Sequence, residues 1–451
     1  MDVNRRMRLT ATPPVARIQV KPVGNHNKNI QYLLVFVLLL SVFIVMASQN
    51  MITLSVTFSS LDRPQRFPGR TLNLSFGKND DTSDKSNSTK DLHAAIVSVN
   101  ETHVARVEQS GDQLTCRPRR NIAFIKTHKT GSTTLASILN RFALNHVLSC
   151  LAYRGDPLRG HIRLDILHKG SSRRFLPPLG VKVGDYAHYR GYNVLTVHVR
   201  LQPKILDYFM AKGTKYITIL REPSSHFESA FFYFRAAKSL FSKGDKQSNL
   251  IKFSKSPLTY WNKLPSMSSK KIYTRNGQIF DLTLDRRIHT NRKVVESIIN
   301  YLSKKMSLVL IMEYMDESLL LLKKLMCWSY EDISYVVKNN RVRTSGMSNS
   351  VRSSLQSWNW ADTLLYDHFN RTLWRKIAEY GPTFQEDLAT FRSILSRDYD
   401  RCVAKQTRNP KMSRVVRTKL ADNSTYCRNL AGSSYRLFHN VWMRQMHRTR
   451  H

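Results

Sequence analysis

The stretch that decides the fold is Asn121–Thr134, which reads NIAFIKTHKTGSTT. Its apolar start, Ile122–Ile125, predicts a short buried strand, and the apolar spacing that begins after Thr134 predicts a helix. The polar loop between them lies where a helix N-terminus offers backbone N–H groups and the positive end of its dipole. Lys129 and several hydroxyl groups add charge and hydrogen-bond donors. We therefore expect this loop to bind a phosphate-like anion.

The position of Lys129 indicates which kind of anion the loop binds. A nucleoside triphosphatase loop places its lysine after the last glycine, whereas Lys129 precedes Gly131. This order resembles the loop that holds the 5′-phosphosulfate of 3′-phosphoadenosine 5′-phosphosulfate in sulfotransferases. The resemblance implies that Lys126 supports the loop and that the donor is held by Lys129, Thr130, Gly131, Ser132, Thr133 and Thr134. Small hydroxyl residues also serve as ordinary N-caps, so the loop alone leaves a structural role open.

A second segment supplies the other half of a nucleotide site. The apolar run Tyr216–Leu220 ends in Arg221, and Ser229 follows on a predicted helix. Ligands of α/β sheets bind at the carboxyl ends of strands, and a guanidinium group suits a phosphate. Arg221 with Ser229 eight positions later resembles the 3′-phosphate site of sulfotransferases. Arg221 by itself would also fit a structural ion pair.

Later segments extend the resemblance to one family. They appear in family order over residues 122–374 and are similar to blocks of the galactose 3-O-sulfotransferase family, which includes galactosylceramide sulfotransferase. The first loop departs from the family pattern at Gly131, where alanine is expected. The similar blocks are Asn193–Arg200, Arg275-Asn276, Phe280–Leu282, Leu310–Leu319, Cys327-Trp328, Trp358-Asn359 and Tyr366–Asn370.

Strand and helix patterns alternate along the chain, which predicts an α/β fold with a mainly parallel sheet flanked by helices. The resemblance implies the P-loop-like sulfotransferase fold. We expect one catalytic domain at 116–430 and a basic C-terminal tail at 431–451. The predicted strands are Tyr192–Val199, Lys215–Leu220 and Ser307–Met312, and the predicted helices are Ser224–Ser239, Asn291–Lys304 and Asp316–Cys327.

The N-terminal part predicts a membrane anchor. The run Tyr32–Ala47 is almost wholly apolar, and basic residues cluster before it. The positive-inside rule then gives a cytosolic tail at 1–31, a transmembrane signal-anchor at 32–48 and a lumenal remainder, starting with a largely disordered stem at 49–115. A cleaved signal peptide is the weaker alternative, since no clear cleavage site follows the run. We expect a single-pass type II protein of the Golgi membrane.

In the lumen, asparagine acceptor triplets can be glycosylated and cysteines can form disulfides. Acceptor triplets begin at Asn73, Asn87, Asn100, Asn370 and Asn423. The five cysteines are Cys116, Cys150, Cys327, Cys402 and Cys427, so at least one is unpaired. Cys402 with Cys427 is one plausible bridge, although pairing cannot be read from sequence. No two cysteines have the spacing of zinc ligands, and no metal is expected.

The net charge of +39 and the pI near 10.3 indicate anionic partners. Nucleic acid would be the first expectation for a soluble protein, but the predicted anchor argues against it. The candidates are then a nucleotide donor, acidic glycans and anionic lipid headgroups. Much of the charge, including that of Arg436–His451, fits a solvated surface.

The implied chemistry is in-line attack of a sugar hydroxyl on sulfur, with Lys129 contacting the bridging and sulfuryl oxygens. Two histidines qualify as general base. We place His198 first, because it ends a predicted strand and matches a histidine proposed as base in related carbohydrate sulfotransferases. His128, inside the donor loop, would then orient the sulfate or the acceptor, and a structural role stays open for both. Asp281, Asp285 and Glu313 fit ion pairs better than sugar contacts.

Three other functions compete with transfer to the 3-hydroxyl of a β-galactose residue on a glycolipid or glycan. A uronyl or heparan 2-O-sulfotransferase would share the donor site and suit the positive charge. A non-catalytic, cationic glycan-binding membrane protein would need neither the Lys129 loop nor Arg221. A glycosyltransferase would use a motif such as Asp398-Tyr399-Asp400, but no apolar strand precedes that string. The exact galactoside and the oligomeric state, a homodimer included, stay open.

Overall fold

The computed structural model describes residues 116–155, 169–241, 244–336, 347–408 and 416–448. The predicted cytosolic tail, membrane anchor and stem, with Asn73, Asn87 and Asn100, lie outside these ranges. Within them, no helix is both long and apolar enough to cross a bilayer.

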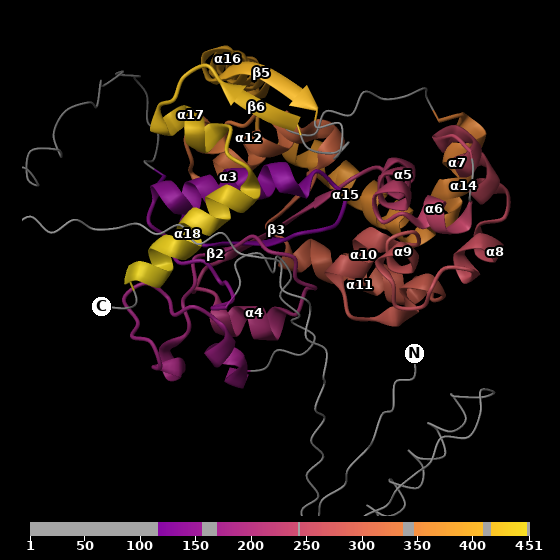
Figure 1. Cartoon of the computed structure of the whole chain (residues 1–451), viewed down its shortest axis with the longest axis horizontal. Helices are drawn as coiled ribbons and strands as arrows, with labels where there is room; N and C mark the ends of the chain where they lie inside the picture. Colours follow the sequence, from indigo (N-terminus) through magenta and orange to yellow (C-terminus); the bar gives the residue numbers. More distant parts are fainter. Residues whose placement is uncertain (1–115, 156–168, 242–243, 337–346, 409–415, 449–451) are drawn as a thin grey trace, which may run out of the picture. The chain divides into compact units, whose positions relative to one another are not determined.

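A four-stranded, wholly parallel sheet forms the centre of the described part (Figure 1). Every residue of the first and fourth strands is buried, which is typical of parallel strands covered on both faces. Because the strands are parallel, their carboxyl ends meet at one edge, where the loops that follow them are brought together. The spatial order is β2 (Val194–Leu195), β1 (Ile122–Ile125), β3 (Lys215–Leu220) and β4 (Leu308–Ile311).

Helices cover the sheet, and in Figure 1 the strands run between α3 (Ser132–Asn145) with α18 (Ser434–Arg448), drawn above them, and α4 (Pro203–Phe209), drawn below. The helices α12 (Met315–Met326) and α15 (Trp360–Ala378) contact β4. The other α-helices are α5 (Pro223–Tyr233), α6 (Ala236–Leu240), α7 (Lys246–Lys255), α8 (Pro257–Asn262), α9 (Ser269–Ile272), α10 (Gly277–Leu282), α11 (Arg292–Lys305), α13 (Tyr330–Ile333), α14 (Asn349–Trp358), α16 (Phe384–Cys402) and α17 (Thr425–Leu430).

Smaller elements complete the described part. The strands β5 (Val403–Arg408) and β6 (Val416–Leu420) form a separate antiparallel pair. The short 3-10 helices are Lys169–Arg174, Tyr186–His188, Arg286–His289 and Met312–Tyr314.

The predicted α/β fold with its parallel sheet is confirmed. The predicted strand Tyr192–Val199 is wrong in length, because only β2 pairs with β1. Beyond β2, Thr196 Oγ1 donates to Asn140 Oδ1 (2.6 Å), and His198 Nδ1 donates to the Lys126 carbonyl (2.9 Å). These side-chain bonds draw the chain away from the sheet edge. His198 consequently lies in a loop beside the loop that follows β1.

The predicted helix Ser224–Ser239 is also divided. It comprises α5 and α6, which are separated by Arg235 with a left-handed φ of 62°. A residue in that conformation cannot continue a right-handed helix. The helix α5 therefore ends at Tyr233.

Two disulfides join segments of the described part. Cys402 pairs with Cys427, so this suggested bridge is confirmed, and Cys116 pairs with Cys327. Cys150 is buried with a free thiol, and burial raises its pKa to about 12. A thiol with so high a pKa is an inert core residue.

The segment predicted as a basic tail contains α18, which packs along α3. The Gln445 side chain is fully buried and bonds to both backbone groups of Cys150. The Arg444 guanidinium donates to the carbonyls of Ala143, Leu144 and Leu148 at 2.9, 2.6 and 3.3 Å. This cation therefore satisfies carbonyls at the C-terminal end of the helix that follows the loop after β1.

We expect Arg444→Ala to lower the free energy of unfolding by about 2 kcal/mol, because hydrogen bonds from a charged group to buried carbonyls are lost. Urea denaturation followed by tryptophan fluorescence measures the change. Arg448→Ala, an exposed arginine on the same helix, is the matched control. Equal stability of the two variants would contradict a bracing role for Arg444.

Candidate active site

The loop after β1 is held in shape by its own hydroxyl groups. Thr127 Oγ1 donates to the Ile219 carbonyl of β3 (2.6 Å) and lies 2.7 Å from Thr130 Oγ1. Ser132 Oγ donates to the Thr127 carbonyl (2.7 Å). All three hydroxyl side chains are buried. Thr130 and Ser132 thus direct their hydroxyl hydrogens into the loop, and what they can offer an anion is their backbone.

The backbone of the loop forms a cradle. Lys129 and Gly131 both have left-handed conformations, with φ of 65° and 76°. Left-handed residues alternating with ordinary ones turn successive N–H groups toward one point, as in other anion-binding loops. Gly131 is the N-cap of α3 and brings no side-chain cap. A Cβ atom there would lie 3.1 Å from Met312 Cγ, so glycine suits both the conformation and the space.

Two lysines of the loop differ in setting. Burial lowers the pKa of Lys126 to about 8, which fits its predicted role as a support. The Lys129 ammonium lies 3.7 Å from the centre of the Tyr233 ring, at the end of α5. Thr133 is exposed and Thr134 half-buried on the first turn of α3. The cation of Lys129 thus lies beside the end of α5.

His128 is paired with a buried carboxylate. Its Nδ1 lies 2.9 Å from Asp281 Oδ2, and its backbone N–H donates to the same oxygen (2.8 Å). Because an ionised carboxylate only accepts, Nδ1 carries the hydrogen, and the lone pair of the neutral ring is on Nε2. The side chains of His128 and Asp281 are 13% and 4% exposed. Tyr273 also donates to Asp281, at 3.2 Å.

His198 stacks on His128, with ring centres 3.9 Å apart and planes 14° from parallel. Its Nδ1 donates to the Lys126 carbonyl, so its Nε2 likewise holds the lone pair of the neutral ring.

Arg221 follows β3 at the same sheet edge and reaches the first loop, where its Nη1 donates to the Lys129 carbonyl (3.3 Å). Gln278 of α10 holds the Arg221 backbone on both sides, since its Oε1 accepts the N–H (2.8 Å) and its Nε2 donates to the carbonyl (2.8 Å). Ser229, in the second turn of α5, is 7% exposed. Its part in a phosphate site stays a prediction.

The helix α10 links both halves of the site and is itself fixed from α15. The buried carboxylate of Asp362 accepts the backbone N–H groups of Gln278 (3.0 Å) and Ile279 (2.8 Å). Asn276, before the helix, has a left-handed φ of 50°, and its N–H donates to Asn359 Oδ1 (2.8 Å). Burial raises the pKa of Asp362 to about 7.

The other carboxylates and Arg200 have structural partners. Asp285 pairs with Arg287 (2.6 Å), as the ion-pair interpretation predicts. Glu313 accepts the Glu222 N–H (3.0 Å) and the Tyr366 hydroxyl (3.3 Å). Arg200 donates to the carbonyls of Phe280 and Thr283. The contacts of Glu313 and Arg200 join segments that are distant in the sequence, whereas the Asp285–Arg287 pair is local and exposed.

The structure brings the Lys129 loop, His128, His198 and Arg221 to one sheet edge, as predicted. Sequence reasoning missed the roles of Gln278, Asp362 and His226. The His226 Nε2 donates to the His128 carbonyl (2.9 Å), and burial lowers its pKa to about 3, so it stays neutral. The only available signal for Gln278 and Asp362 was their nearness to similar blocks of the family. Among the described residues, no cluster of His, Cys, Asp or Glu is arranged to hold a metal ion.

Comparisons with known proteins place this geometry in context. A family model described as galactose-3-O-sulfotransferase matches residues 24–421. The galactosylceramide sulfotransferase of Mus musculus is 34% identical over 281 residues, which cover 62% of this chain and 62% of the relative. The protein of the same name from Homo sapiens is 35% identical over 283 residues, with 61% and 62% covered.

A further relative is galactose-3-O-sulfotransferase 2 of Homo sapiens, which is 33% identical over 275 residues. These residues cover 60% of this chain and 65% of the relative. The chain therefore spans less than two thirds of the length of each of these relatives.

We expect Asp362→Asn to change the pH dependence of stability. The pKa of Asp362 is raised on folding, so its stabilising contribution is present below its ordinary pKa and is lost as the pH rises through about 7. From about pH 5 to about pH 7, wild type should lose stability relative to the variant by up to about 1 kcal/mol per pH unit. Urea denaturation at several pH values measures this difference.

Asp285→Asn is the control for that series, because hydrogen bonds from Arg287 lower the pKa of Asp285, so this carboxylate stays ionised over the range and adds no pH dependence there. A stability difference between wild type and Asp362→Asn that stays constant with pH would show that Asp362 does not change its protonation in this range.

Proposed function

Because the chain belongs to the galactose-3-O-sulfotransferase family, we propose that it transfers a sulfuryl group from 3′-phosphoadenosine 5′-phosphosulfate to the 3-hydroxyl of a β-galactose residue. The observation that supports this best is the meeting of Lys129, Arg221 and two stacked histidines at one edge of the parallel sheet. Relatives whose names include galactosylceramide sulfotransferase support a galactose-containing glycolipid or glycan as acceptor.

The donor set fits an anionic nucleotide. The 5′-phosphosulfate end would be held by Lys129, by the backbone N–H groups of the cradle and by the hydroxyls of Thr133 and Thr134. The 3′-phosphate would be held by Arg221 with Ser229. The carboxylate of Asp281 accepts hydrogen bonds from the Nδ1 and the backbone N–H of His128. The donor supplies an activated sulfur and a phosphate leaving group.

We propose His128 as the general base. The sequence alone favours His198, but the geometry gives His128 the stronger support, since only its Nδ1 donates to a carboxylate. His128 Nε2 would take the proton of the galactose 3-hydroxyl while the hydroxyl oxygen forms its bond to sulfur and the bond between sulfur and the bridging oxygen of the 5′-phosphate breaks, which releases 3′-phosphoadenosine 5′-phosphate. Asp281 stabilises the resulting imidazolium and keeps the lone pair on Nε2 beforehand. His198 orients the ring by stacking.

We further propose that the protein is a single-pass type II protein of the Golgi membrane. The apolar run at 32–48, preceded by basic residues, supports this arrangement. Such an anchor would keep the catalytic domain beside membrane-bound acceptors.

We expect Lys129→Ala to lower the rate of sulfate transfer about 10²- to 10³-fold, as loss of one preorganised cationic donor typically does. The measurement is transfer of labelled sulfate from 3′-phosphoadenosine 5′-phosphosulfate to a panel of β-galactosides and to desulfated heparan. The full chain is used in detergent, and Lys304→Ala, an exposed lysine of α11, is the control.

Label on the galactose 3-hydroxyl supports the proposal, and label on heparan alone would favour the 2-O-sulfotransferase alternative. A chain that does not bind the nucleotide would overturn the sulfotransferase function and favour a non-catalytic glycan-binding protein.

We expect Asp281→Asn to lower kcat about 10²- to 10⁴-fold while binding of the nucleotide is preserved. An asparagine amide can donate to Nδ1 and so place the ring hydrogen on Nε2, where it blocks proton uptake. Pre-steady-state transfer and nucleotide titration separate the two effects.

Asp285→Asn is the matched control, and Asp281→Glu should restore part of kcat. If Asp281→Asn keeps the wild-type kcat while His198→Ala abolishes transfer, His198 is the base instead.

A further inference from the structure

A lobe built by α7, α8 and α9, residues 246–272, combines strong positive charge with exposed apolar side chains. No aspartate or glutamate occurs in it, although the whole chain has 32 acidic residues against 71 lysines and arginines. Its cations are Lys246, Lys252, Lys255, Lys263, Lys270 and Lys271.

Met267 is the most unusual residue of this lobe. Its side chain is 72% exposed, and its φ of 57° is left-handed, a conformation that residues with a Cβ atom rarely adopt. It lies in a turn that is closed by the Ser268 N–H donating to the Pro265 carbonyl (3.3 Å). Water disfavours the exposure and sterics disfavour the conformation. Two unfavourable features at one exposed residue indicate that the turn of Met267 has a function.

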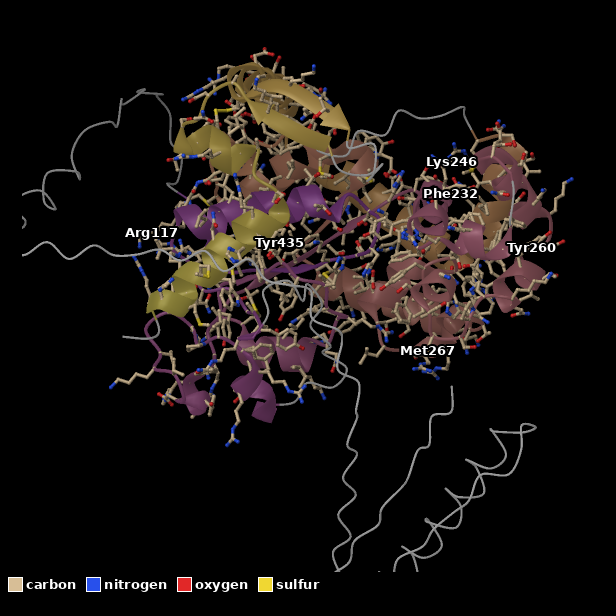
Figure 2. All side chains as sticks on the ribbon, in the orientation of Figure 1. Arg117, Phe232, Lys246, Tyr260, Met267 and Tyr435 are labelled. Atoms are coloured by element: carbon tan, nitrogen blue, oxygen red, sulfur yellow. A yellow bond between two sulfur atoms is a disulfide. The ribbon has the colours of Figure 1, made fainter. Side chains whose placement is uncertain are left out.

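Other side chains of the lobe also combine apolar surface with positive charge. Leu258, near the start of α8, is 55% exposed. The Lys263 ammonium lies 5.5 Å from the Tyr260 ring centre, and the Lys271 ammonium lies 4.5 Å from that of Trp261. In Figure 2, Tyr260 lies at the right-hand edge of the molecule and Met267 at its lower edge. Exposed apolar side chains, amphipathic rings and a surplus of lysines are typical of protein surfaces that lie on membranes.

We propose that the α7–α9 lobe docks on a lipid bilayer that contains anionic headgroups. The lysines would contact the headgroups, and Met267 and Leu258 would enter the boundary between headgroups and acyl chains. An anionic glycan would use the same lysines but would gain nothing from the two apolar tips. The apolar exposure therefore favours the bilayer.

The lobe is connected directly to the candidate site. Tyr273 follows α9, and its ring centre lies 4.2 Å from that of His128. Thr274 Oγ1 donates to the Lys270 carbonyl (2.6 Å), and Trp358 Nε1 donates to the Thr274 carbonyl (2.7 Å). Docking would thus hold the site next to the bilayer surface. Resting on the proposed function, this favours lipid-linked galactosides as acceptors.

The test uses the full chain reconstituted into vesicles, with Met267→Cys labelled by an environment-sensitive fluorophore. The vesicles consist of phosphatidylcholine alone or of phosphatidylcholine with phosphatidylserine. Each composition is also prepared from lipids with brominated acyl chains, which quench the fluorophore on contact. Tyr435→Cys, which replaces a 48% exposed side chain of α18, is the matched control and lies outside the lobe. Because quenching needs no catalysis, this result is independent of the proposed reaction.

Quenching at position 267, strengthened by phosphatidylserine and absent at position 435, is the expected result. Lack of quenching at 267, or equal quenching at both positions, overturns the proposal. A fluorescence change at 267 with soluble heparin but not with vesicles also overturns it, in favour of a glycan surface. As a second readout, Met267→Ser with Leu258→Ser should raise KM for vesicle-borne galactosylceramide several-fold and leave KM for a soluble galactoside unchanged.

Discussion

The buried carboxylate of Asp362 fixes the start of α10, and both halves of the candidate site depend on that six-residue helix. Gln278 of this helix holds the backbone of Arg221, and Asp281, one turn later, holds the ring and backbone of His128. Arg221, after β3, and His128, in the loop after β1, are therefore both positioned by one short helix. A shift of α10 would displace the two residues together, so their relative position is kept.

The parts of this arrangement that sequence reasoning predicts are those with a local signal. The strand Lys215–Leu220 is predicted with its exact bounds, and Ile122–Ile125 likewise, because a strand buried on both faces is a continuous apolar run. The loop between β1 and α3 is recognisable because its residues must meet the conformation and the charge of an anion cradle. Since parallel strands end at one edge, the meeting of Arg221 with the first loop follows from topology.

The remaining features depend on contacts between distant residues, which leave no local pattern. His128 and Asp281 are 153 positions apart, and Asn140 and Ser434 are 294 apart. The end of β2 is decided by Thr196 bonding to a helix rather than by the apolar run in which it lies. The helix α18 looks like a solvated basic segment because Arg444 and Gln445 are polar, yet their polar groups satisfy carbonyls that the core leaves open.

The disulfide between Cys116 and Cys327 has a mechanical consequence. The Arg119 N–H donates to the Met326 carbonyl (2.8 Å), and Trp328 Nε1 donates to the Arg119 carbonyl (2.9 Å). Hydrogen bonds therefore join the same two segments beside the disulfide. A pulling force applied to the chain ahead of residue 116 would pass through the bridge into the end of α12. The strand β1 and the loop behind it would be spared the tension. Tension on the preceding chain would thus leave the conformation of the segment that carries His128 and Lys129 unchanged.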